Sequence, residues 1–246
     1  MSNTVNLPIL KELIPDGVEY GANLLVEFEP HSIWYETSFT IAAHALRLGV
    51  RTDYHTWMRS PSKVREVFAK LGFDVKKLEQ EDYLRILDSY TAQTGLGVPE
   101  IRKQSGPYAA LFRSVKVSDL SLATAQEIKA GFQELDKRRL HLDDNNSVLA
   151  QYNEEKAVIE YYRTRVIPYC KAVELAAIHS LAVGVHSDTM YKQLESFCDG
   201  IIDFKSQEKG EKIEHLVRVR LMRNMNYDSR WRHLKLTDNG EVTLVD

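Results

Sequence analysis

The sequence predicts a three-layer α/β domain with a mostly parallel central sheet and β hairpins at its C-terminal end. Three observations carry this prediction. Short apolar runs alternate with segments of helical periodicity, no Pro/Gly/Ser-rich linker divides the chain, and hairpin patterns replace the alternation from Ile213 onward. The 246 residues are enough for one substantial core, so we expect a single domain over residues 1–246.

The first half of the chain supplies three expected strands and two expected helices. The apolar run at residues 24–28 indicates a buried strand, and residues 32–48 carry apolar side chains at helical spacing before Gly49. A second strand is expected at residues 51–57. Ser60 and Pro61 are typical of a helix start, and that helix ends near Gly72. Residues 83–87 are expected to form the third strand.

Residues 88–117 contain several glycines and prolines and are expected to be mostly loop. Ser118 or Asp119 is expected to cap a helix that reaches about Lys137. A long helix is expected over residues 154–171, with Pro168 bending or ending it, and another over residues 187–197. The remaining expected strands are 139–142, 175–180, 200–204, 213–222, 231–236 and 242–245, the last two joined by an Asp-Asn-Gly turn.

Composition excludes several classes of protein. The formal net charge of −3 is unlike the basic balance of a dedicated nucleic-acid binder. Cys170 and Cys198 lie outside any metal-binding spacing and are expected to be buried free thiols. No apolar run approaches the roughly 18 residues of a membrane helix. The N-terminus lacks the apolar region of a signal peptide, so we expect a cytoplasmic protein.

Short motifs follow several of the expected strands in a fixed order. They are Glu29-Pro30 before a helix, Ser60-Pro61, Leu142-Asp143, Gly184-Val185-His186-Ser187, Tyr191-Lys192-Gln193-Leu194-Glu195, Asp199-Gly200-Ile201-Ile202-Asp203 and Arg218-x-x-x-Met222-Arg223. Their order and spacing resemble KaiC-like proteins of the RecA ATPase superfamily over about residues 14–245. The resemblance implies a RecA-like P-loop NTPase fold. It also implies relatives that are common in archaea, assemble into rings or filaments, and act in signalling, timing and motility.

The phosphate-binding loop of this family departs from its pattern here. The family reads Glu-Pro-Gly-x-Gly-Lys-Thr-Thr, whereas this chain continues Glu29-Pro30 with His31, Ser32, Ile33, Trp34 and Tyr35. The glycines let successive backbone N–H groups face phosphate oxygens, the lysine binds phosphate, and the hydroxyl binds Mg²⁺. An isoleucine is costly where the loop needs a positive φ. The resemblance therefore implies a degenerate Walker A loop, with no bound ATP or Mg²⁺ expected.

Two further sites of the family are altered and one is partly kept. The positions of the catalytic glutamates are Met58 and Arg59, so no carboxylate remains there to activate water. Asp143, followed by Asp144, stands at the Walker B position and is expected to be vestigial. The inter-subunit Lys-Met-Arg motif reads Leu221-Met222-Arg223, so the lysine is lost and the arginine stays.

Several residues have a functional and a structural interpretation. Trp34 and Tyr35 are either a stacking platform for a ligand or core that fills the lost loop, and the filling is favoured. His31, His55 and His141 suggest a metal, but spacing places no third ligand, so no metal site is predicted. A basic cluster on the hairpins is either an interface or a solvated, salt-bridged face; its members are Arg218, Arg220, Arg223 and Trp231, with Arg230 and Arg232 nearby.

These observations favour a non-catalytic KaiC-like pseudo-ATPase. Its expected role is that of a regulatory or scaffold module in signalling, and its expected partners are proteins, either copies of itself or an active KaiC-like paralogue. The alternative is a member that still binds a nucleotide or another small ligand in a remodelled pocket, with weak hydrolysis at most. Association with DNA is a third possibility that the near-neutral charge disfavours.

Overall fold

The computed structural model of the chain describes residues 3–94, 114–121 and 138–245. The expected strands are all present. They are β3 (Asn23–Phe28), β4 (Arg51–Thr56), β5 (Leu84–Asp88), β6 (Arg139–Asp143), β7 (Leu175–Ala182), β8 (Gly200–Lys209), β9 (Lys212–Met222), β10 (Arg232–Leu236) and β11 (Val242–Val245). β8 continues beyond its expected end at Phe204 because it pairs with β9 as far as Lys209.

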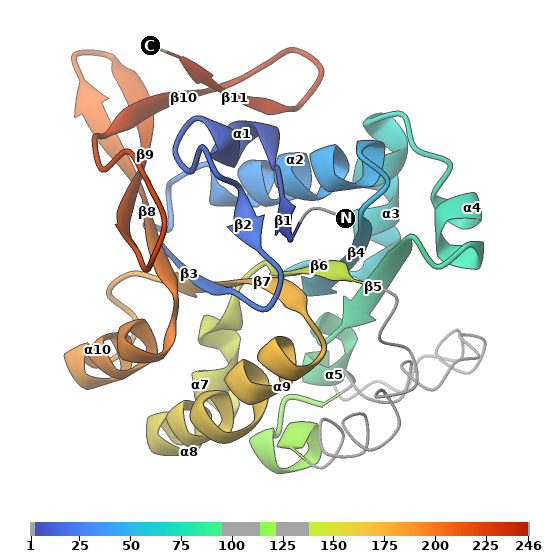
Figure 1. Cartoon of the computed structure of the whole chain (residues 1–246), viewed down its shortest axis with the longest axis vertical. Helices are drawn as coiled ribbons and strands as arrows, with labels where there is room; N and C mark the ends of the chain where they lie inside the picture. The colour runs from blue at the N-terminus through green and yellow to red at the C-terminus, as the bar shows by residue number, and fades with distance from the viewer. Residues whose placement is uncertain (1–2, 95–113, 122–137, 246) are drawn as a thin grey trace.

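These strands form a sheet in the order β11-β10-β9-β8-β3-β7-β6-β4-β5. The strands from β8 to β5 run parallel, and β9, β10 and β11 join them as antiparallel strands. Figure 1 shows helices on both sides of the sheet. The predicted three-layer α/β fold with C-terminal hairpins is therefore confirmed.

The expected helices around the first strands are also present. α2 (Trp34–Arg47) follows β3, and α3 (Pro61–Lys70) follows β4, with the Ser60 hydroxyl accepting a hydrogen bond from the backbone N–H of Lys63. α10 (Asp188–Phe197) precedes β8. The described part of the chain contains no helix long and apolar enough to cross a membrane. Cys170 and Cys198 are buried free thiols, as expected.

The expectation of loop over residues 88–117 is wrong in part. β5 extends to Asp88, and α5 (Tyr90–Thr94) follows at once, its first turn fixed by the hydrogen bond from Thr91 N–H to the Asp88 carboxylate. Residues 95–113 lie outside the described residues. Helical backbone begins at residue 117, so neither Ser118 nor Asp119 is the cap, and most of the helix expected up to Lys137 lies outside the described residues. The Asn153 side chain accepts from the Val117 N–H instead.

The long helix expected over residues 154–171 is interrupted. α8 (Glu155–Tyr161) passes into a π-helical turn, Tyr162–Val166, and then into α9 (Ile167–Ala172), where Pro168 lies in the first turn. Proline lacks the N–H that a regular helix needs and clashes with the preceding turn. A wider π turn before it lets the helix continue without that hydrogen bond, which explains why Pro168 modifies the helix instead of ending it.

Short elements without a strong pattern were not predicted. They are β1 (Thr4–Val5), α1 (Pro8–Lys11), β2 (Val18–Glu19), α4 (Val75–Gln80), the 3₁₀ turn Asn146–Val148 and α7 (Leu149–Tyr152). Elements this short span little more than one helical turn or two residues of strand, so periodicity is not readable in them.

The two faces of the sheet bury separate cores. On one face α2 and α3 cover β4 through stacked and edge-on rings of Phe39, Tyr54 and Phe68, with centroid distances of 4.6–5.7 Å. On the other face, α8, the π turn and α10 cover residues such as Leu25, Leu181 and Trp57. Because side chains alternate along a strand, Tyr54 and its neighbour His55 face opposite layers.

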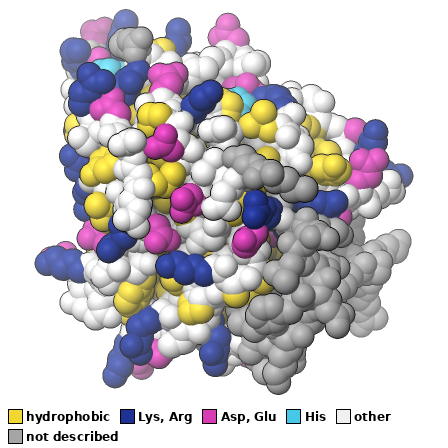
Figure 2. Space-filling model, viewed as in Figure 1, with side chains coloured by type: hydrophobic (Ala, Val, Ile, Leu, Met, Phe, Trp, Pro, Cys, Tyr) yellow, Lys and Arg dark blue, Asp and Glu magenta, His cyan; other side chains and the backbone are white. Residues whose placement is uncertain are grey.

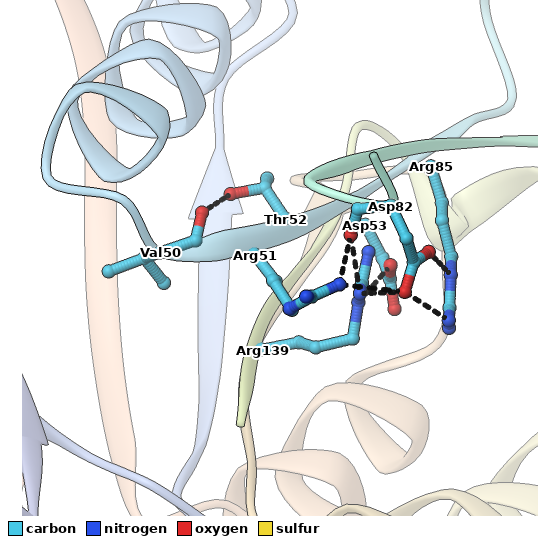
Figure 3. A network of polar contacts seen from close by, with 7 residues as sticks. All are labelled: Val50, Arg51, Thr52, Asp53, Asp82, Arg85 and Arg139. Atoms are coloured by element: carbon cyan, nitrogen blue, oxygen red, sulfur yellow. Dashed lines mark hydrogen bonds and ion pairs between the residues drawn. The ribbon is translucent and has the colours of Figure 1, made fainter. Parts of the chain in front are cut away.

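The amino ends of β4 and β6 are joined by an ion-pair network (Figure 3). Arg139, whose side chain is only 4% exposed, donates from Nε to the Asp53 carboxylate at 2.6 Å and from Nη1 to the Asp82 backbone oxygen at 3.1 Å. Arg51 and Arg85 also bond to the Asp82 carboxylate. Burial raises the pKa of Asp82, but the Arg85 hydrogen bond and the charges of the three arginines outweigh it and leave the pKa below 3.8.

The first prediction concerns this network. Arg139→Met should lower the free energy of unfolding by about 3–5 kcal/mol, because it leaves the buried Asp53 carboxylate short of a donor. Arg163→Met is the matched control, since the exposed Arg163–Glu160 pair should contribute less than about 1 kcal/mol. Urea unfolding of the three proteins measures both changes, and equal losses in the two variants would contradict the prediction.

The same network makes the stability of the protein depend on pH. The pKa of Asp82 is lower in the folded chain than the ordinary value of 3.8. Its contribution to stability is therefore complete above that ordinary value and declines as the pH falls through the folded value.

Candidate functional site

The turn between β3 and α2 carries the residues that the resemblance assigns to the phosphate-binding loop. The Trp34 side chain is fully buried, 6.2 Å from the Phe28 ring and 5.1 Å from the Phe204 ring. Its indole N–H donates to the backbone oxygen of Asp144 at 2.9 Å. The indole thus joins the turn to the carboxyl end of β6, and its ring and its polar atom are both engaged within the chain.

The backbone of this turn avoids the strained conformation expected for Ile33. Ile33 has φ −87°, and among the described non-glycine residues only Asp82, Glu174 and Asn224 have positive φ. Ser32 closes the turn by donating from both its N–H and its hydroxyl to the Glu29 carbonyl, at 2.9 and 2.7 Å. The turn therefore adopts a backbone conformation that isoleucine tolerates.

The turn is also tied to β8 by polar contacts. The Glu29 carboxylate accepts from the Ser206 N–H at 2.9 Å, and the Ser206 hydroxyl donates to the His31 carbonyl at 2.9 Å. The His31 side chain is exposed. A carboxylate at the start of the loop is thus fixed by the protein backbone.

Tyr35 lies beside Trp34 at the beginning of α2. Its hydroxyl accepts from the Asn145 amide at 3.1 Å, its ring packs edge-on against Phe28, and the Arg59 guanidinium lies 5.7 Å from the ring centroid. Burial, with a smaller effect of the Asp144 carboxylate, raises the pKa of Tyr35 to about 12. Tyr35 is therefore a neutral phenol at physiological pH.

Asp144 is the acidic side chain that faces the segment after β4. One carboxylate oxygen accepts from the Trp57 N–H at 2.8 Å, and the other accepts from the Thr56 hydroxyl at 3.1 Å. The Met58 N–H lies 3.5 Å from the second oxygen. Burial raises the pKa of Asp144 to about 7 against the lowering effect of these donors. Asp144 thus fixes the backbone at the positions where the family has its catalytic glutamates.

Those positions themselves hold no acidic side chain. Met58 is 44% exposed, and Arg59 is half-buried with its guanidinium over the rings of Tyr35 and Phe39, at 5.7 and 5.5 Å from their centroids. The structure therefore brings three groups of sequence-predicted residues together at the carboxyl edge of the sheet: residues 31–35, residues 58–59 and Asp144.

Asp143 points away from this assembly, although it directly precedes Asp144. Its carboxylate lies 2.7 Å from His55 Nδ1, 3.3 Å from His141 Nε2 and 2.7 Å from His179 Nδ1, and it accepts from the Asn146 amide at 2.9 Å. Burial raises the pKa of Asp143, but the three imidazoles outweigh it and hold the pKa well below its usual range. Burial lowers the pKa of His55 in spite of the carboxylate.

The sequence named His55 and His141 as metal candidates but did not group them with Asp143 and His179. His141 and Asp143 lie on β6, whereas His55 and His179 come from β4 and β7. Only the strand order places β4, β6 and β7 side by side, with His55 opposite Asp143. A histidine within each of the three strands was the available signal, and it needs that order before it can be used.

The basic residues of the C-terminal hairpins have partners within the chain. Arg218 pairs with Asp203 at 2.7 Å and lies over the Trp231 ring, and Arg220 contacts Glu27, Glu195 and Asp203 at 2.6–3.2 Å. Arg223 donates to the carbonyls of Ser196 and Cys198 at the end of α10. This helix end therefore supplies Arg223 with acceptors inside the chain.

Asp144 generates the second prediction. Its pKa is about 7 in the folded chain and near 3.8 when unfolded, so its contribution to stability is complete below pH 3.8 and is lost as the pH rises toward 7. Between pH 4.5 and 7.5 the free energy of unfolding should fall less in Asp144→Asn than in the wild type, by on the order of 2–4 kcal/mol. Asp238→Asn, in the exposed turn before β11, is the control and should keep the wild-type slope. An unchanged slope in Asp144→Asn, measured by urea unfolding, would refute the assignment.

Comparison with known proteins places the chain in a family. No curated protein matches it. Among solved structures, a KaiC-like protein from the hyperthermophilic archaeon Pyrococcus horikoshii is similar with a TM-score of 0.70 and 15% identity, over 100% of this chain and 97% of that one. That likeness supports the fold. The family described as "ATPase: KaiC" matches residues 39–245, which is most of the sequence. The chain therefore belongs to the KaiC family of ATPase domains.

Proposed function

We propose that this chain is a KaiC-family member that no longer hydrolyses nucleotide and acts as a regulatory or scaffold protein, with signalling as its setting. The observation that carries the proposal is the position of Trp34. Its indole is fully buried in the turn between β3 and α2, and its N–H is bonded to the Asp144 carbonyl. A P-loop uses this part of the fold to present backbone N–H groups and a lysine to phosphate.

The chemistry of the turn also disfavours a polyphosphate. Glu29 and Glu36 bring negative charge to either end of the segment, and the Glu29 carboxylate is held by Ser206. Tyr35 replaces the Mg²⁺-binding hydroxyl with a buried phenol whose pKa is about 12. The family match begins at residue 39 and leaves the whole turn outside, in agreement with a segment that has diverged from its relatives.

The machinery for activating water is reduced as well. Met58 and Arg59 occupy the positions of the catalytic glutamates, and the carboxylate of Asp144 is engaged by Thr56 and the Trp57 N–H. Loss of a general base and of charge stabilisation in the transition state costs several powers of ten in rate. We therefore propose that the retained role is association with proteins, either copies of this chain or an active KaiC-like paralogue.

The proposal does not depend on the hairpin arginines, which are engaged within the chain. Figure 2 shows Lys and Arg side chains interspersed with Asp and Glu over the face in view. A mixed surface with a net charge of −3 suits protein contacts better than binding along a nucleic-acid backbone.

Arg59 favours the second candidate, a KaiC-family member that binds a small anionic ligand in a remodelled pocket. Its guanidinium stacks on Tyr35 and Phe39, and within the described part of the chain it has neither a carboxylate partner nor a side-chain hydrogen bond. A half-buried guanidinium with free donors can bind a phosphate or carboxylate. Asp144 lies near the same tyrosine, since its negative charge contributes to the raised pKa of Tyr35.

The third prediction separates these candidates. The purified protein should release no phosphate from ATP or GTP above background in the presence of Mg²⁺, because the lysine, the hydroxyl and the glutamates are all replaced. Its unfolding temperature should also be unchanged by millimolar Mg-ATP. A ligand that binds only the folded state would raise the free energy of unfolding by RT ln(1 + [L]/Kd), and the unfolding temperature with it.

Two outcomes distinguish the alternatives. Turnover that is lost both with EDTA and in the Asp144→Asn variant would overturn the non-catalytic proposal. A shift in unfolding temperature that disappears in Arg59→Gln, without turnover, would support ligand binding in its place.

Measuring the mass in solution, alone and with an active KaiC-like paralogue, tests association. A strict monomer that captures no paralogue would contradict the scaffold role.

A further inference from the structure

The strongest unassigned feature is a group of imidazole and carboxylate side chains on three adjacent strands. Register pairs His55 of β4 with Asp143 of β6, and it pairs Leu142 with Ile178 of β7, so the next residue, His179, stands beside Asp143. His141 lies two residues before Asp143 and faces the same way. Because Tyr54 and Leu142 face the core under α2, this row faces the opposite layer.

Within this row three side chains direct one ligand atom each toward a common point. His55 Nδ1 and His141 Nε2 both approach Asp143 Oδ1, at 2.7 and 3.3 Å. These three atoms all lie within 4.8 Å of one another. We propose that His55, His141 and Asp143 form a binding site for a divalent transition metal of the zinc class.

The dimensions suit such an ion. Zinc bound at 2.0–2.1 Å in a tetrahedron separates its ligand atoms by about 3.3 Å. His141 Nε2 and Asp143 Oδ1 are already at that separation, and His55 Nδ1 must move away from the carboxylate by a fraction of an ångström. The two imidazole nitrogens lie within 4.8 Å of each other. Two imidazoles and one carboxylate fill three positions and leave a fourth for water or another donor. This donor set suits zinc better than magnesium or calcium, which prefer oxygen ligands.

The side chains around the proposed ligands hold them in the binding orientation. His55 Nε2 contacts the Ser89 hydroxyl at 2.8 Å, which leaves Nδ1 directed at the site. The second oxygen of Asp143 is bonded to His179 and Asn146, so Oδ1 is the oxygen presented to the metal. Metal-ligating histidines and carboxylates depend on outer partners of this kind for their orientation and affinity.

The site is buried between the strands that supply its ligands. His55 and Asp143 are 5% and 3% exposed, and the Trp57 ring packs 4.6 Å from the His55 ring. A bound ion would join β4 to β6 on the face opposite α2, and His179 would extend the connection to β7. The site is separate from the nucleotide chemistry discussed above, because Asp143 and Asp144 face different surroundings.

The experiment uses the full chain, freed of metal with EDTA and titrated with Zn²⁺ against a chromophoric chelator. We expect one Zn²⁺ per chain and a higher unfolding temperature in the metal-bound protein. His141→Gln should weaken Zn²⁺ binding at least about 100-fold, because losing a ligand costs no less than losing an outer partner. His233→Gln is the matched control, since His233 is exposed on β10 and distant in sequence from the cluster.

A second measurement covers the case in which His141→Gln folds poorly, as judged by circular dichroism of the metal-free proteins. Co²⁺ bound to the wild type should give the visible bands of a tetrahedral nitrogen and oxygen site, without a thiolate band, because Cys170 and Cys198 are not ligands. Failure of the wild type to bind Zn²⁺, equal affinity in a folded His141→Gln variant, or a thiolate band would each overturn the proposal.

Discussion

Buried polar groups at the carboxyl edge of a parallel sheet must be satisfied inside the protein, and this requirement governs the centre of the molecule. A buried carboxylate without donors or counter-charges is too costly to keep ionised. Asp143 and Asp144 meet the requirement in opposite directions. Asp143 takes imidazoles and an amide, whereas Asp144 takes backbone N–H groups and a hydroxyl, with burial raising its pKa. The end of β6 is thereby fixed on both faces of the sheet.

The same requirement operates at the other end of the sheet. There the buried guanidinium of Arg139 needs acceptors, and it finds them on β4 and on the turn before β5. β4 and β6 are therefore bound by polar contacts near each of their ends, and apolar side chains fill the space between. Such contacts fix strand register more sharply than apolar packing, which tolerates exchanges of similar volume.

The sequence was sufficient for the layers and for the strands, because their apolar runs are long enough to show a period. The resemblance also directed attention to the turn after β3, because His31 and Ile33 stand where the family pattern has glycines. It could not reveal that Ile33 adopts an ordinary φ or that the Trp34 indole donates to Asp144, because both depend on the packing of distant segments. The histidine cluster was hidden for the same reason, as its members are far apart in the chain.

The π-helical turn at Tyr162–Val166 has a consequence for how this segment compares with those of relatives. A π turn holds one residue more than the regular helix around it. Removing that residue would restore a regular helix but rotate α9 against α8 by about 100°. Tyr162, whose ring packs edge-on 5.2 Å from His179, and Cys170, buried in α9, could then no longer face their present neighbours together. A chain one residue shorter here would need different side chains on the face of the sheet that these helices cover.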